Sequence, residues 1–548
     1  MTLTPEIKAR FGLAADQMTP NALIQALLTA EVDLLWFGGI GTYVKATHES
    51  HAQAGDRAND AVRVDATALR CKVIGEGANL GITQFGRIAF AQAGGRINTD
   101  FIDNSAGVDC SDHEVNIKIL VDSVMADGDM TEKQRNALLA KMTNEVGDLV
   151  LRDNYLQTQA ISLIEAEAAD VLDNHVRLMR MLERQGLLNR EVESLPSDDA
   201  LAERAAARQG LTRPEISVLF STCKMWLYDQ ILETDLPDDR HLGEDVVRYF
   251  PSNLRKKFAT RIANHRLRRE LIATSITNSL INRVGGTFVT KIGEETGMPA
   301  ADITRAYIIS RDVFRTREVW EQIEALDNIV PVAVQTTLHR EVQRLLERGT
   351  LWFLRSGGTP IRITENIAAF GPGVAALAEK LDVVLPDDMN GRIRFRAERY
   401  EDEGVPEDLA LRVAYLLVMV SACDIVRIAA DRGIAAESVA QLYFAIGETL
   451  GFGWLRYQAE QLAVTNYWQK LAVAAVIDEF YGHQRDVALR VLDTAGRPDD
   501  GAIETWTDAN RAAVERARSL VGELQSATSM DFSMLTVASR QLRTLAQG

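Results

Sequence analysis

The sequence is poor in cysteine, and this shortage excludes two classes of protein. Only four cysteines occur among 548 residues, Cys71, Cys110, Cys223 and Cys423, and they are widely spaced, without a C-x-x-C pair or a nearby histidine cluster. A disulfide-stapled fold and a zinc-binding fold are therefore not expected. A reducing cytoplasm is the predicted compartment.

Excess positive charge is also lacking. The chain has 60 Lys and Arg against 77 Asp and Glu, a formal net charge of −17. Because a nucleic-acid backbone requires a basic surface, we expect no nucleic-acid partner. The longest apolar run, residues 413–423, is well short of the ~18 residues of a membrane-spanning helix, so we expect no membrane contact. The N-terminal residues, with Glu6, Lys8 and Arg10, do not form a signal-peptide pattern.

The composition changes near residue 130. Residues 1–130 hold 13 of the 37 glycines, whereas six of the seven tryptophans lie after them. A chain of this length should divide into several domain-sized units. We expect a multidomain protein in which a partial α/β segment over residues 1–130 is followed by a large all-α domain over residues 131–548. A loop near residues 355–360 would divide that domain into two helical subdomains.

The early segment contains the pattern of a parallel sheet. Residues 32–37, 71–74 and 96–102 are apolar runs typical of strands, and residues 83–93 between the last two have helical spacing. Strand, helix and strand in this order indicate a βαβ unit, so we predict a Rossmann-like parallel sheet. A further helix is expected to begin at Ser111, where Glu114 completes a capping-box spacing.

A glycine-rich turn follows the first predicted strand. Gly39, Gly41 and Thr42 lie in the stretch Gly38–Thr42, where exposed backbone amides allow close approach of a phosphate or ribose. The stretch is not a G-x-G-x-x-G fingerprint, because Val44 occupies the third glycine position. A tight turn without a ligand is the alternative interpretation.

A second glycine turn, Glu76-Gly77-Ala78-Asn79, follows the second predicted strand. The amide of Asn79 can both donate and accept a hydrogen bond, which is what a nicotinamide carboxamide requires. The alternative is that Asn79 only stabilises its own turn.

The stretch Asn104–Ser111 joins the third predicted strand to the helix predicted at Ser111. A hydroxyl at a helix N-terminus suits a carboxylate ligand, because the free amides and the helix dipole favour an anion there. The alternative is that Ser111 only caps its own helix, and one hydroxyl does not easily do both.

Three charged stretches are interpreted as structural. The carboxylates of Asp56 and Asp60 suggest a metal, but nothing else converges on them, and a solvated face is the expectation. His113 and Glu114 are neighbours on a helix and point in different directions, so surface or domain-contact positions are expected rather than a general base. The basic run 265–269 predicts a helix ion-pair face or an interdomain contact. We expect no metal site.

Residues 73–79 and 104–111 together resemble the late half of the nucleotide-binding domain of glutamate dehydrogenases. The resemblance is closest to the large-subunit, NAD-specific bacterial class, whose C-terminal third this chain would form. Ala106 stands where the family pattern has the first of two glycines. The resemblance implies NAD as cofactor, with contacts from Gly39, Gly41, Thr42, Asn79 and Asn104. It also implies that Val108 and Ser111 line the pocket for the substrate side chain.

The implied reaction is the reversible oxidative deamination of L-glutamate to 2-oxoglutarate and ammonia. The family's catalytic lysine and aspartate lie in an upstream domain that no segment here resembles, so no catalytic residue is expected in this chain. We expect it to be inactive without the remainder of the subunit, because hydride transfer needs both substrates held together with a proton acceptor. The alternative is that most of the chain is a non-catalytic helical module for regulation or for assembly into a homo-oligomer.

Overall fold

The computed structural model describes residues 1–464, 466–498 and 501–547. The chain divides into two compact units, Met1–Lys291 and Ile292–Gly548, and the division falls inside the helix α14 (Phe288–Thr296). It coincides with neither the boundary predicted near residue 130 nor the one predicted near residues 355–360. The predicted all-α character of the larger part is confirmed, because every element after β4 (Val73–Glu76) in the described ranges is helical.

The strands of the first unit form two small parallel pairs. β1 (Leu34–Phe37) pairs with β4, with Leu34 opposite Val73 and Phe37 opposite Glu76. β2 (Val44–Lys45) pairs with β3 (Val64–Asp65), a pairing that the sequence did not indicate. The parallel β1–β4 pair agrees with the first two predicted strands, although a complete Rossmann-like sheet is not formed by these short pairs.

The third predicted strand, residues 96–102, is wrong for most of its length. Only Arg96 joins the sheet, through a parallel bridge to Val73, with its carbonyl accepting from the Ile74 amide at 2.9 Å. The chain then turns into the short helix α5 (Asp100–Asp103). The apolar residue Ile102 is buried on this helix rather than on a strand, so a short apolar run did not distinguish the two structures.

The helix between these segments is confirmed, and the helix start at Ser111 is not. α4 (Gln84–Gln92) begins after Thr83, whose hydroxyl accepts from the Gly86 amide at 3.0 Å. α6 (Ser105–Ala126) begins six positions before Ser111, and Asn104 is its N-cap. Ser111 therefore lies within the helix, where its hydroxyl donates to the Gly107 carbonyl at 3.2 Å instead of capping a terminus.

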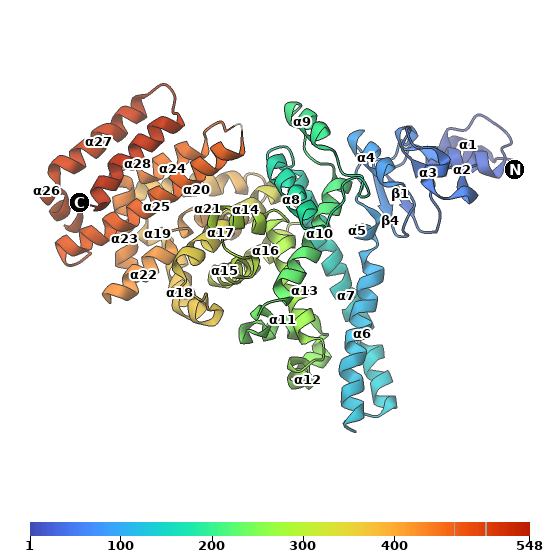
Figure 1. Ribbon diagram of the computed structural model, residues 1–548, viewed down its shortest axis with the longest axis horizontal. Coiled ribbons are helices and arrows are strands. Elements are labelled where there is room, and N and C mark those ends of the chain that lie inside the picture. The colour runs from blue at the N-terminus through green and yellow to red at the C-terminus, as the bar shows by residue number, and fades with distance from the viewer. Residues whose placement is uncertain (465, 499–500, 548) are drawn as a thin grey trace. The chain divides into compact units, whose positions relative to one another are not determined.

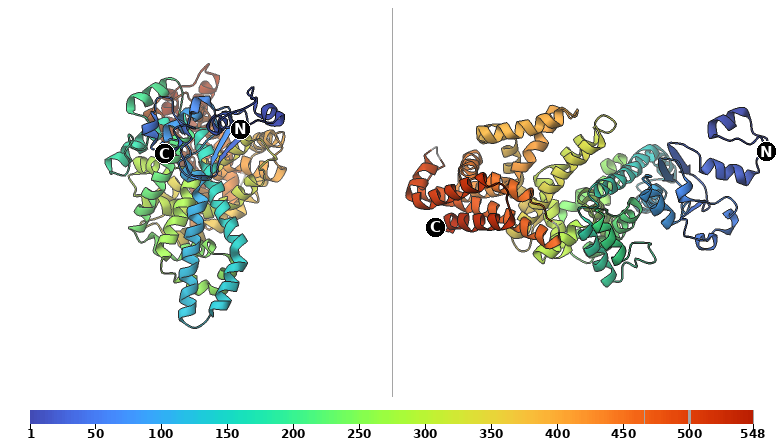
Figure 2. Two further views of the ribbon diagram at one scale, coloured as in Figure 1. Left: turned by 90° about the vertical axis from the view of Figure 1, so that its right-hand side faces the viewer. Right: turned by 90° about the horizontal axis from the view of Figure 1, so that it is seen from above.

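The remaining helices of the first unit cover and extend this small α/β part (Figure 1). α6 continues through a short turn into α7, and the two lie side by side as a hairpin (Figure 2). The other elements are α1 (Pro5–Phe11), α2 (Pro20–Leu28), α3 (His51–Ala54), η1 (Arg57–Asn59), η2 (Ala66–Ala68), α7 (Glu132–Glu165), α8 (Leu172–Arg184), α9 (Asp198–Ala206), α10 (Arg213–Leu232), η3 (Leu236–Asp238), η4 (Arg240–Leu242), α11 (Gly243–Tyr249), α12 (Ser252–Ala263) and α13 (Arg268–Val284).

The first turn of α10 connects the helical part of this unit to its α/β part. Arg213 is buried and donates to the Asn98 side-chain oxygen at 3.1 and 2.9 Å, beside the end of the small sheet. Its guanidinium also pairs with Glu165 of α7 at 2.8 Å. The Thr99 hydroxyl donates to the Pro214 carbonyl at 3.0 Å. These contacts explain why residues on both sides of position 130 belong to one compact unit.

The second unit is built from helices alone in the residues described. Within it α15 packs against α17 and α18, and α25 packs against α24, α26 and α28. Its helices are α15 (Ala300–Val313), α16 (Thr316–Glu324), α17 (Val332–Ser356), α18 (Ile363–Ala378), α19 (Leu381–Val384), α20 (Asp387–Glu401), α21 (Glu407–Met419), α22 (Ala422–Arg432), α23 (Ala436–Thr449), α24 (Phe452–Glu460), α25 (Tyr467–Ala495), α26 (Ala502–Ala509), α27 (Arg511–Ser526) and α28 (Phe532–Gln547).

Within the described ranges, no single helix has both the length and the apolar composition needed to cross a membrane. The consecutive helices α21 and α22 reach that length and composition only together, and a bend of 62° separates them.

Candidate functional site

The two asparagines that the sequence singled out lie in contact. Asn79 is exposed in the turn after β4, and Asn104 precedes α6. The Asn104 side-chain amide donates to the Asn79 side-chain oxygen at 2.7 Å. This contact occupies the acceptor of Asn79 and leaves the Asn79 amide nitrogen available as a donor to a ligand.

A buried ion pair holds the turn that carries Asn79. Arg87 of α4 binds Glu76 through two bonds, Nε to Oε2 at 2.6 Å and Nη2 to Oε1 at 2.9 Å, and both side chains are almost completely buried. Arg87 Nη2 also lies 3.1 Å from Asp100 Oδ2. That same Asp100 oxygen accepts from the Leu80 amide at 2.8 Å. The guanidinium thus fixes the carboxylate that binds the backbone of the turn.

Leu80 has the left-handed backbone conformation, with φ of 66°, which is uncommon for a residue with a branched side chain. Its side chain is 66% exposed, so no apolar burial offsets this strain. Two hydrogen bonds hold its backbone, one from its amide to Asp100 and one from the Thr42 hydroxyl to its carbonyl. Such strained residues persist where surrounding contacts hold them, and they concentrate at ligand sites.

The Gly38–Thr42 turn is tied to the same place by Thr42. The Thr42 hydroxyl donates to the Leu80 carbonyl at 2.8 Å, its amide donates to Asp56 Oδ2 at 2.8 Å, and its carbonyl accepts from Arg63 Nε at 2.8 Å. Thr42 is 7% exposed. Its donors therefore have protein partners. The expectation that Asp56 is merely solvated is corrected, because its carboxylate anchors the Thr42 amide.

Gly39 and Gly41 differ in their surroundings. Gly39 is exposed, and no atom lies within 4 Å of where its Cβ would be, so a ligand can approach this backbone closely. Gly41 is buried with φ of 131°, and a Cβ there would lie 2.6 Å from the Asn59 side chain. Gly41 is thus required by the fold of the turn, and Gly39 is the open position beside it.

The exposed indole of Trp36 lies against the backbone of β4 and its turn. A Cβ on Gly75 would lie 2.6 Å from the Trp36 ring, and one on Gly77 would lie 2.3 Å from it. These two glycines are therefore needed for the close approach of Trp36, which remains 59% exposed. The indole is a spectroscopic reporter next to the Asn79 turn.

Val108 and Ser111, the two residues expected to line the substrate pocket, are exposed on α6, with Val108 at 76%. Because Ser111 is inside the helix, the free amides of a helix N-terminus do not surround it. Its single O–H group donates to the Gly107 carbonyl and can donate to a ligand only in place of that bond. The predicted position of Ser111 at a helix N-terminus is therefore wrong.

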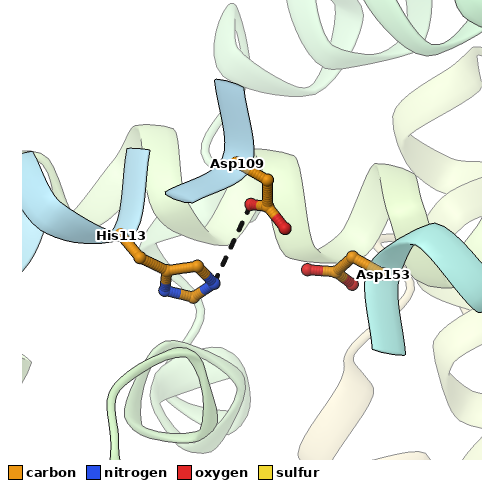
Figure 3. Close-up of side chains that lie close together, drawn as sticks. All are labelled: Asp109, His113 and Asp153. Atoms are coloured by element: carbon orange, nitrogen blue, oxygen red, sulfur yellow. Dashed lines mark ion pairs between the residues drawn. The ribbon is translucent and has the colours of Figure 1, made fainter. Parts of the chain in front are cut away.

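The buried side of α6, away from Val108, carries a second group of ionisable residues. Asp109 and His113 on α6 face Asp153 on α7, and one ligand atom from each lies within 4.8 Å of the others (Figure 3). His113 Nε2 is 3.8 Å from Asp109 Oδ1. Burial and the neighbouring carboxylates of Asp153 and Asp112 raise the pKa of Asp109 to about 7.

His113 is 2% exposed, so the alternative of a surface position is wrong, and its contacts lie within the first unit. Its ring stacks on Tyr249 of α11 with centroids 4.4 Å apart, and burial lowers its pKa. Burial also lowers the pKa of the Lys224 ammonium, on α10, to about 7, although Asp153 and Asp109 oppose this shift. The basic run 265–269 likewise makes contacts within the unit: His265 Nε2 lies 3.1 Å from the Asn116 carbonyl, and Arg269 pairs with Asp238.

Several residues that shape the site were missed from the sequence. The clearest available signal was Arg87, a charged residue on the apolar face of α4 next to the buried Ile88. Fully buried arginines are rare unless they are paired, so its position called for a carboxylate partner. Asp103 had no such signal: it accepts from the Glu76 amide at 3.0 Å and from Asn98 at 2.8 Å, a role that depends on the tertiary fold.

These residues fit part of a dinucleotide rather than all of it. The donor left on Asn79 and the open backbone at Gly39 suit a nicotinamide carboxamide and its ribose. The chain has no G-x-G-x-x-G turn among the strands described, so the pyrophosphate has no corresponding cradle in these residues.

Two family models match this chain. Residues 1–164 match the model described as bacterial NAD-glutamate dehydrogenase, catalytic domain. Residues 208–544 match the model described as glutamate dehydrogenase, C-terminal. The second match alone covers more than half of the chain.

Curated relatives resemble the chain over its whole length. The NAD-specific glutamate dehydrogenase of Pseudomonas aeruginosa is 47% identical over 549 aligned residues, which is 100% of this chain and 34% of that protein. The proteins of the same name from Halomonas elongata and Mycobacterium tuberculosis are 42% and 39% identical, with the same coverage. The chain thus spans about a third of the length of the relatives that it matches.

Proposed function

The chain belongs to the bacterial NAD-glutamate dehydrogenase family, and we propose that it supplies the nicotinamide-side and substrate-side wall of an active site of that kind. The reaction is the oxidation of L-glutamate by NAD to 2-oxoglutarate and ammonia. In this proposal the catalytic residues that accept protons belong to another part of the subunit, and the residues of this chain bind and orient the reactants.

The hydrogen-bonded pair Asn79–Asn104 carries the proposal. Asn104 holds the Asn79 side chain with its amide nitrogen free to donate to the carboxamide of the nicotinamide. Fixing the carboxamide fixes the plane of the ring, and ring orientation decides which face receives the hydride. Because the turn is held by the buried Glu76–Arg87 pair and by Asp100, it does not need to reorganise when the cofactor binds.

The substrate lies on the exposed face of α6 in this proposal. Val108 supplies an apolar contact for the methylene groups of glutamate. The Ser111 hydroxyl exchanges its bond to the Gly107 carbonyl for one to the distal carboxylate of glutamate. When NAD is bound, it accepts the hydride from the substrate Cα. The chain contributes binding and orientation to that step, which account for a large part of the rate of a two-substrate reaction.

The exposure of this surface supports a site completed by other residues. Ile40 beside the glycine turn is 93% exposed and Val108 is 76% exposed. Apolar side chains that line a closed active site are usually covered, because closure excludes water from the reaction. We propose that the remainder of the subunit covers this surface.

The proposal is tested by measuring glutamate-dependent NADH formation. The chain alone, the remainder of the Pseudomonas aeruginosa relative alone, and a chimera that joins the two are compared. Activity in the chimera and its absence in both parts is the expected result. Activity of the chain alone would overturn the assignment of the catalytic residues to another part.

A second role is proposed for the Ile292–Gly548 unit, as an assembly module. This role is supported by large aromatic residues that are exposed on the unit. Trp468 is 71% exposed and Phe395 is 65% exposed. Such residues are enriched at protein interfaces. Sedimentation of the chain should show a homo-oligomer that Trp468→Ala weakens. A monomer at all concentrations would contradict this role.

A further inference from the structure

The group of Asp109, His113 and Asp153 has unsatisfied ligand atoms at its centre. His113 is 2% exposed, and neither of its ring nitrogens has a hydrogen-bond partner among the described residues. The same holds for Asp109 Oδ2. Buried polar atoms in folded proteins are normally paired, so an unfilled group of this kind is unusual. We propose that these three residues form a binding site for one divalent transition-metal cation that ties α6 to α7.

The local geometry supports convergence on an ion. Asp109 and His113 are four residues apart on α6, which places them on one face of the helix. Figure 3 shows both side chains directed toward Asp153 across the gap between the helices. Tyr249 stacks on the His113 ring and fixes its plane, so one ring nitrogen is held 3.8 Å from Asp109 Oδ1. The imidazole is thus already positioned as a ligand.

The donor set selects the class of ion. One imidazole and two carboxylates suit a borderline cation such as Zn²⁺, Co²⁺ or Mn²⁺ better than Mg²⁺ or Ca²⁺, which take oxygen ligands. With ligand bonds of about 2.0–2.2 Å, neighbouring ligand atoms in a tetrahedral site lie roughly 3.4 Å apart. The ligand atoms lie within 4.8 Å of one another, so binding would require the Asp153 and Asp109 carboxyl groups to rotate inward. Water would complete the coordination.

The Lys224 ammonium is the cation of the chain itself that could balance these carboxylates in place of a metal ion. Its ammonium interacts electrostatically with both Asp109 and Asp153, and so competes for the same negative charge. An ammonium only donates, so it cannot accept a hydrogen bond from the ring N–H of a neutral His113. Lys224 also lines a cavity of about 440 Å³ together with Tyr228 and Thr277.

A bound cation would also restrain the exposed face of α6. Val108 precedes Asp109 on α6 and faces outward, so a cation bound to Asp109 restrains the stretch that includes Val108 and Ser111. Asn154, next to Asp153 on α7, already donates to Ser105 Oγ at 2.9 Å at the start of α6. Gln157 of α7 also donates to Ser105 Oγ, at 3.3 Å, and a metal would add a further tie between the same helices. This inference concerns cation binding and does not depend on the proposed activity.

The test is direct binding of Zn²⁺ and Co²⁺ to the whole chain after treatment with a chelator. Calorimetry should give one equivalent of Zn²⁺ per chain, and Co²⁺ should develop the visible absorption bands of a protein-bound ion. Each of the substitutions Asp109→Asn, Asp153→Asn and His113→Gln should weaken metal binding by about tenfold or more. Loss of a ligand should lower the metal affinity at least as much as loss of a residue that supports a ligand. Lys224→Gln should tighten binding by removing the competing charge.

The matched control is His51→Gln. His51 also lies 3.8 Å from a carboxylate, Asp60, but this pair is exposed. Its substitution should leave the affinity unchanged. Failure of the wild-type chain to bind either ion would overturn the proposal, as would equal affinity of the wild type and the three ligand variants. Circular dichroism of each variant shows whether a loss of binding is due to a loss of folding. The Co²⁺ spectrum of the wild type tests the proposal without any substitution.

Discussion

The Asn104 side chain donates a hydrogen bond to the Asn79 side-chain oxygen over 2.7 Å. One residue follows a strand and the other precedes a helix, so their contact joins the two elements that end at the proposed nicotinamide site. The contact also determines which atoms of Asn79 remain free, namely the two N–H groups of its amide.

Loss of the Asn104 amide should loosen the Asn79 side chain without unfolding the turn. Asn104→Ala, introduced into the chimera with the remainder of the relative, is expected to weaken NADH binding by roughly tenfold, the effect of about 1–1.5 kcal/mol for one hydrogen bond. Energy transfer from tryptophan to NADH measures the affinity. Asn189→Ala, an exposed loop asparagine of the same unit, is the matched control and should bind NADH as the wild type does.

The buried pair Glu76–Arg87 should be a large contributor to the stability of the first unit. Arg87→Met leaves the carboxylate of Glu76 buried without its partner, and the expected cost is about 3–5 kcal/mol of the free energy of unfolding. Urea denaturation measures it. The exposed pair Lys72–Asp33, at 2.7 Å, provides the control, because Lys72→Met should leave the free energy of unfolding nearly unchanged. Equal effects of the two substitutions would contradict the account.

The close approach of Trp36 to Gly77 predicts a local rather than a global effect of a methyl group. Gly77→Ala should displace the exposed indole, at a cost of about 1–3 kcal/mol, because its Cβ would lie 2.3 Å from the ring. The fluorescence of Trp36, isolated by difference against Trp36→Phe, should shift. Gly39→Ala meets no atom within 4 Å and should leave both the stability and the emission unchanged.

His175 on α8 should make the first unit less stable in acid. It is buried and its Nδ1 has no hydrogen-bond partner in the part of the chain described. Burial lowers its pKa to about 4 from an ordinary value of 6.5. The folded state therefore binds the proton less tightly than the unfolded state, so the stability present above pH ~6.5 is lost as the pH falls toward 4.

The full effect is about 3 kcal/mol, from the difference between the two pKa values. His175→Leu should flatten the dependence of the free energy of unfolding on pH between about 6.5 and 4. Parallel pH profiles of the variant and the wild type would contradict this origin of the acid sensitivity.

The sequence allowed prediction of the features that local patterns determine. β1, β4 and α4 follow from apolar runs, glycine breaks and helical spacing, and the parallel pairing follows from their order. The start of α6 was misplaced because Ser111 and Glu114 have a capping-box spacing inside a longer helix. Asn104 caps that helix without a side-chain hydrogen bond, and so gave no signal of its own.

Contacts between distant segments were beyond the sequence patterns. The docking of Arg213 on Asn98 joins residues that are far apart in the chain, and no local rule relates them. The group at Asp109 could not be predicted either, because Asp153 lies on another helix and meets Asp109 and His113 only in the folded chain. The charged stretch at Asp56 was interpreted as solvated for the same reason, since its partner Thr42 precedes it in another loop.

The central claim is that this chain forms the nicotinamide-side and substrate-side wall of a glutamate dehydrogenase site. The most direct test is steady-state kinetics of the chimera with Asn79→Ala and with Ser111→Ala. Asn79→Ala should raise KM for NAD by about tenfold with little change in KM for glutamate, and Ser111→Ala should do the reverse. If both variants keep the two KM values and kcat of the parent chimera, these residues do not contact the reactants and the account is wrong.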